Sequence, residues 1–124
     1  MKALQIVEMA LPYVGQQPED SEDLLALALP MMNTALQEML AVENSIRRYR
    51  EKKELDEAPW LETWEDDVPY EPALTRRALP YWLAYRFLQD DDQDGRASYY
   101  YNEYVNALNE AQKLHSESVV DAYA

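Results

Sequence analysis

Apolar residues recur at helical spacing in four stretches of the chain. In the first stretch they stand three or four positions apart, which predicts a short helix over 2–14 that Gly15 ends. The second stretch predicts a long helix over about 22–52, kinked near Pro30 because proline interrupts the backbone hydrogen bonds of a helix. The apolar face of this long helix contains Leu25, Ala28, Leu29, Met32, Leu36, Met39, Leu40, Glu43 and Ile46.

The other two helices are predicted in the C-terminal half of the chain. Pro72 suits the first turn of a helix over 71–89, which Pro80 is expected to kink. A tyrosine-rich helix follows over about 93–115. Their apolar faces contain Leu74, Ala78, Tyr81, Trp82, Tyr85 and Leu88 in the first, and Ala97, Tyr100, Tyr101, Tyr104, Leu108 and Ala111 in the second.

Between the second and third helices, residues 54–70 lose the helical period. This segment, called the linker below, carries two prolines and the tryptophans Trp60 and Trp64. We expect an irregular acidic connection that the two indole rings fix to the helices, with room for one short strand. The tail 116–124 is weakly patterned and is expected to fray or to dock on a neighbouring molecule.

Length and composition favour one all-α domain over residues 1–124. The chain holds only two glycines, which is few for a fold made of strands and hairpins. Its net charge of −13 would repel nucleic acid over most of the surface, although DNA could still pass along it. With no cysteine, thiolate chemistry and cysteine metal sites are excluded. We find neither a signal peptide nor an apolar run of membrane-spanning length.

One acidic turn resembles the start of a calcium loop. Asp90, Asp92, Asp94 and Gly95 match its opening D-x-D-x-D-G between two helices. The twelfth position, which requires a bidentate glutamate, is Tyr101. We therefore predict a solvated, helix-capping turn, no metal site and no cofactor.

A basic cluster lies at the end of the long helix and supplies candidate interface residues. Arg47, Arg48 and Arg50 stand with two lysines where cations suit the negative end of a helix. The cluster is either a solvated helix end or a contact for an acidic partner or phosphates. The remaining interface candidates are Trp60, Trp64 and Tyr99.

Residues that could carry catalysis are scarce. His115 is the single histidine, and no serine or aspartate near it in sequence suggests a catalytic triad. The tyrosine run has one nearby cation, Arg96, so its helical spacing favours packing over a platform for stacked bases. We predict no catalytic residues and no enzymatic activity.

Read from end to end, the chain resembles the head-to-tail connector (adaptor) proteins of tailed phages and prophages. Four blocks within residues 1–113 carry the resemblance: LPYVG, LLALALPMMNTALQEML, TWEDDVPYEPALTRRALPYWLAYRFLQDDD and YYYNEYVNALNEAQK. They are packing and turn patterns without a site motif, so no functional residue transfers from the family.

The resemblance implies a helical subunit that forms a homo-oligomeric ring below the portal and extends the DNA channel toward the tail. The implied partners are the portal protein, neighbouring copies of the chain, and a stopper or tail completion protein, with DNA passing through without sequence-specific binding. The implied location is the virion, and the bacterial host cytoplasm before assembly. A ring needs two different complementary patches on each subunit. The basic cluster facing an acidic patch of the next subunit is one hypothesis for such a pair, and it predicts that reversing the charge of Arg47 and Arg48 abolishes assembly.

Two other classes remain open from the sequence. One is a small acidic helical module that engages a basic protein partner or mimics DNA. The other is a calcium-responsive helix pair built on the acidic turn.

Overall fold

The computed structural model describes the backbone of residues 1–16 and 22–123 and the side chains as far as Gln112. This part of the chain is all-α, as predicted, and contains no β-strand; an isolated bridge joins Lys2 and Asp67. Its helical elements are α1 (Ala3–Ala10), the 3-10 turn η1 (Leu11–Val14), α2 (Glu22–Tyr49), the π-helical turn η3 (Leu74–Ala78), α3 (Leu79–Asp90) and α4 (Asp94–Tyr123).

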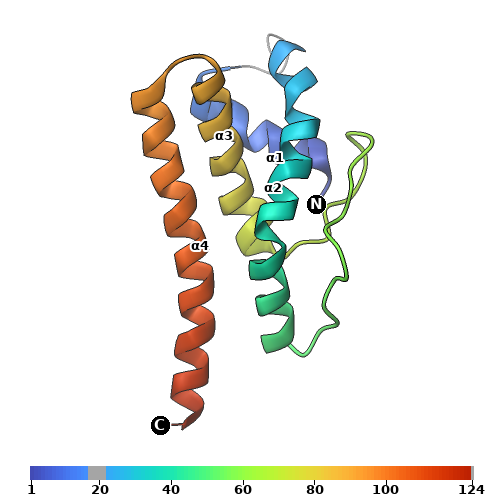
Figure 1. Ribbon diagram of the computed structural model, residues 1–124, viewed down its shortest axis with the longest axis vertical. Helices are drawn as coiled ribbons and strands as arrows, with labels where there is room; N and C mark the ends of the chain where they lie inside the picture. The colour runs from blue at the N-terminus through green and yellow to red at the C-terminus, as the bar shows by residue number, and fades with distance from the viewer. Residues whose placement is uncertain (17–21, 124) are drawn as a thin grey trace.

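The helices pack around one apolar core. Figure 1 shows α2, α3 and α4 running along the long axis of the molecule, with α1 crossing them near the end where α3 turns into α4. The linker follows α2 on the side away from α4 (Figure 1). The largest fully buried side chains are contributed by all of these helices except α4: Ile6, Val7, Leu11, Met32, Leu36, Met39, Leu74, Leu79, Leu83, Phe87 and Leu88, with Glu43 among them.

Three helical segments end in the same backbone conformation. Gly15, Glu51 and Asp92 have positive φ angles of 74°, 58° and 55°. In each case the next residue donates its N–H to a carbonyl five positions earlier, which satisfies the last carbonyl groups of the helix. These bonds join Gln16 to Leu11 (3.0 Å), Lys52 to Arg47 (2.8 Å) and Gln93 to Leu88 (2.9 Å).

The end of α2 differs from the prediction because of this geometry. The predicted helix runs to 52, but α2 ends at Tyr49 because Glu51 adopts the left-handed conformation. Glycine is the usual residue there, so the sequence holds no obvious stop signal. Gly15, in contrast, ends the first helical segment as expected.

The two internal prolines have different effects. Helix α2 continues through Pro30. Proline has no N–H to donate to the carbonyl of Ala26, four residues earlier. Both residues are exposed. Before Pro80 the helix widens into the π turn η3, where the N–H of Leu79 donates to the carbonyl of Leu74. A proline ring clashes with the carbonyl four residues earlier in a regular helix, and the wider turn relieves that clash.

Asparagine side chains of α2, rather than both tryptophans, hold the linker in place. The Asn33 amide donates to the carbonyl of Leu61 (2.9 Å) and accepts from its N–H (2.7 Å). Asn44 makes the same pair of bonds with Leu55, at 3.0 and 2.8 Å. The expectation that two indole rings fix the linker is half wrong: Trp64 packs against the core, but Trp60 is 68% exposed.

Helix α4 is longer than the sequence pattern predicts. It continues to Tyr123, past the predicted end at 115 and through most of the tail, for which fraying or docking on a neighbouring molecule was expected. Its final turns extend beyond the ends of α2 and α3 in Figure 1. The side chain of His115 lies outside the described side chains.

Candidate functional site

The basic cluster at the end of α2 binds acids of the same molecule. Arg47 Nε contacts Glu43 Oε2 at 2.6 Å, and the Glu43 side chain is completely buried. The other oxygen of Glu43 accepts the backbone N–H of Glu71 at 2.6 Å. Arg47 also donates to the carbonyls of Lys53 (3.1 Å) and Pro69 (2.7 Å). Arg47 therefore joins α2 to both ends of the linker.

A second acid completes this junction. Glu71, 7% exposed, receives Lys52 Nζ at 3.0 Å and an Arg50 guanidinium nitrogen at 3.3 Å. Arg48 pairs with Glu54 at 2.8 Å. The sequence reasoning missed Glu43 and Glu71 as partners, although a glutamate within the apolar face of α2 was a usable signal.

The structure changes how the basic cluster can be tested as an interface. Arg47 is 17% exposed and holds the fold together, so reversing its charge would break contacts inside the subunit. Arg48 and Arg50 are 62% and 56% exposed and could meet a second molecule as well as their internal partners. The contact with an acidic partner stays a prediction, with Arg48 as the residue to change.

The exposed aromatic candidates lie on two different faces. Trp60, 68% exposed, belongs to the linker, and Tyr99, 59% exposed, belongs to α4. The linker and α4 flank opposite sides of α2 and α3 in Figure 1. Trp64 is partly buried against the core and is a poorer candidate for contact with another molecule.

The tyrosines form one half-buried stack and one exposed edge. Tyr13, Tyr81 and Tyr100 bring η1, α3 and α4 together, with ring centroids 5.4 to 6.3 Å apart. Tyr104 is buried, but Tyr101, predicted on the same inward face, is 45% exposed and contacts the Tyr85 ring at 5.0 Å. The tyrosine run mainly joins helices, as the spacing predicted.

The acidic turn between α3 and α4 is a helix end joined to a helix start. Asp92 takes the left-handed conformation that closes α3, while Asp94 and Gly95 already lie in α4. A calcium loop needs its glycine in a sharp turn, and Gly95 is helical here. Among the described residues, no group of three or more His, Asp or Glu side chains is placed to hold a metal ion.

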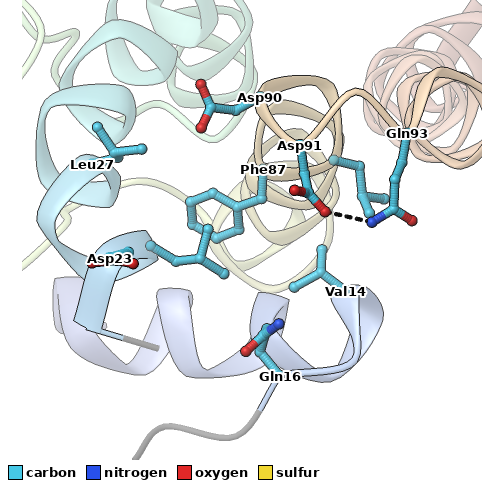
Figure 2. Close-up of a pocket in the computed structure, with 10 residues that line it drawn as sticks. Val14, Gln16, Asp23, Leu27, Phe87, Asp90, Asp91 and Gln93 are labelled. Carbon is cyan, nitrogen blue, oxygen red and sulfur yellow. Dashed lines mark hydrogen bonds between the residues drawn. The ribbon is translucent and has the colours of Figure 1, made fainter. Parts of the chain in front are cut away.

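A pocket of about 300 Å³ opens at this same end of the bundle (Figure 2). Its walls come from the start of α2, the end of α3 and the residues after η1. Phe87 forms part of an apolar floor, and Asp23, Asp90 and Asp91 stand around it. Of these three aspartates only Asp90 stood out in the sequence, as part of the calcium-like turn, because the position of all three beside one hollow depends on tertiary packing.

Helix α2 meets the length and composition of a membrane span, contrary to the sequence-based expectation. An 18-residue window in it has a mean hydropathy of 1.3, and a third of that window is buried. In the structure α2 packs within the bundle, and the polar side chains of Asn33 and Glu43 on its inner face bind the linker and Glu71. These contacts show that the inner face of α2 belongs to the core.

Comparison of the chain with protein-family models, curated proteins and solved structures gives no match.

Proposed function

We propose that this chain is a structural subunit that assembles as a ring between the head and the tail of a phage or prophage particle. The resemblance in sequence motivates the proposal, and the all-α fold is compatible with it. The subunit would bind the portal protein, copies of itself, and a stopper or tail completion protein.

The observation that carries the proposal is the placement of two exposed aromatic side chains. Closed rings use heterologous contacts, in which one face of a subunit meets a different face of the next. Trp60 on the linker and Tyr99 on α4 are the most exposed large aromatic side chains among the described residues, and these two segments flank opposite sides of the bundle (Figure 1). Aromatic residues are enriched at protein interfaces because they bury much area at low entropic cost.

Two other features are consistent with a channel subunit. The net charge of −13 would give a ring a negative lumen, which weakens the adhesion of DNA and lets it pass. The end of α4 extends beyond the bundle, where it could contact a neighbouring subunit (Figure 1).

The test is co-expression with the portal protein of the same phage, followed by purification and electron microscopy. The unaltered chain should form a ring on the portal, and Trp60→Ala and Tyr99→Ala should each prevent it. Tyr49→Ala, which removes a half-exposed ring at the end of α2, serves as the matched control and should assemble.

Mixing the two deficient variants sharpens this test. Each variant keeps the patch that the other lacks, so one contact should form between unlike copies, giving a 1:1 complex and no ring. The proposal fails if the unaltered chain does not associate with the portal, or if both alanine variants still form rings.

A further inference from the structure

We propose that the pocket at the acidic end of the bundle binds a basic segment of another protein, taking up a lysine or arginine side chain. The inference goes beyond the connector role and needs no ring. It assigns a defined site to the second class of function, in which an acidic module binds a basic protein partner.

The pocket combines an apolar floor with a rim of carboxylates. Its floor includes Phe87 and Leu27, and the phenyl ring of Phe87 faces the hollow in Figure 2. Asp23, Asp90 and Asp91 lie around it, and none of the described residues that line it is a lysine or arginine. Its volume of about 300 Å³ lies at the lower end of the range for ligand pockets.

Two of these carboxylates are placed unfavourably for the fold itself. Asp23 lies in the first turn of α2, where a negative charge is favoured by the helix dipole. Asp90 and Asp91 lie at the C-terminal end of α3, where the dipole disfavours negative charge. Among the described ion pairs none involves these three residues, and Asp91 receives a 2.6 Å hydrogen bond from Gln93. A cation from outside would relieve this repulsion.

Lysine and arginine fit both parts of the pocket at once. Their methylene stems can lie on the apolar floor while the charged ends reach the carboxylates. A second copy of the chain is a poor source of this cation. Seven of its eleven Lys and Arg residues fall in 47–53 and at 76–77, among several acids, and two copies at −13 repel each other. The favoured occupant is therefore a net-basic partner protein.

The test is a nuclear magnetic resonance titration of the isotopically labelled full chain with a short blocked peptide, Leu-Arg-Ala-Leu-Arg. Amide shifts should concentrate around residues 23–27 and 87–93. Two control peptides separate the contributions: Leu-Gln-Ala-Leu-Gln removes the charge, and Gly-Arg-Gly-Gly-Arg removes the apolar part. Both should bind more weakly than the probe peptide.

Variants locate the site. The double variant Asp90→Asn with Asp91→Asn should weaken binding about five- to tenfold. The control is Asp56→Asn with Glu57→Gln, which changes the charge equally on the exposed linker and should weaken binding less than about twofold. Leu27→Ala trims the floor at a position already 41% exposed, so it should weaken binding while leaving the fold intact. Shifts spread evenly over the acidic surface, equal losses in the two charge variants, or equal binding of the glycine peptide would overturn the proposal.

Discussion

Replacing Glu43 with glutamine tests the junction between α2, the linker and α3. Glutamine has nearly the same shape as glutamate, but one carboxylate oxygen becomes an NH2 group. In the structure both oxygens of Glu43 accept, one from Arg47 Nε and the other from the N–H of Glu71, each at 2.6 Å. Whichever way the amide turns, one of these donors faces another donor, and the charge that balances Arg47 is lost.

The magnitude follows from the burial of these groups. A hydrogen bond to a charged group contributes about 1.5–3 kcal/mol, and removing one partner of a buried ion pair costs about 3–5 kcal/mol. Arg47 keeps its bonds to the carbonyls of Lys53 and Pro69 and is partly exposed, which reduces the loss. We expect Glu43→Gln to lower the free energy of unfolding by about 2–3 kcal/mol, and the melting temperature by about 10 °C for a chain of this size.

Urea unfolding followed by tryptophan fluorescence and circular dichroism measures this effect. Glu57→Gln provides the control, because Glu57 is exposed on the linker and the substitution changes the net charge equally. The control should stay within about 0.5 kcal/mol of the unaltered protein. If Glu43→Gln also stays within that margin, the junction does not stabilise the fold as argued.

Two further predictions concern the linker and the aromatic helix. Asn33→Ala removes both hydrogen bonds to Leu61 and should lower the free energy of unfolding in urea by about 2 kcal/mol. Asn106→Ala, on the exposed face of α4, is the control and should change stability little. Equal effects of the two substitutions would contradict the role of Asn33. Burial, together with the negative charge of Glu38, raises the pKa of Tyr104 to about 12. The folded state therefore holds the hydroxyl proton of Tyr104 more tightly than the unfolded chain does. The contribution of this residue to the free energy of unfolding is complete below about pH 10 and is lost as the pH rises toward 12. Tyrosinate absorbance and unfolding curves across this range check it, and a Tyr104→Phe variant that loses stability equally steeply would argue against this residue as the cause.

The positions of the helices could be predicted from the sequence because each has its own apolar period. The face chosen for α2, including Glu43, is the face that the structure buries or half-buries. Helix ends were less predictable. Gly15 predicts the end of its helical segment, but Glu51 and Asp92 adopt the same left-handed conformation although they are not glycines. Hydrogen bonds across each turn satisfy the last carbonyl groups of the helix there, and these bonds are not visible in a local pattern.

The hydrogen-bond and ion-pair partners of polar side chains could not be predicted from the sequence. Asn33 and Asn44 are ordinary helix residues in the sequence, yet in the fold they bind the linker backbone 28 and 11 positions further along the chain. The sequence left the basic cluster open as a solvated helix end or an interface; in the fold Arg47 pairs with the buried Glu43, while Arg50 and Lys52 pair with Glu71 and stay more than half exposed.

The sequence by itself determined the helical class, the approximate helices, the acidic charge, the single histidine and the lack of cysteine. These follow from short-range periodicity and composition, which every stretch of chain carries locally. Only the tertiary structure decided which acids meet which bases, that Trp60 is exposed while Trp64 packs inward, and that three aspartates line one pocket with an apolar floor. Such relations join residues distant along the chain, so they exist only once the core has formed.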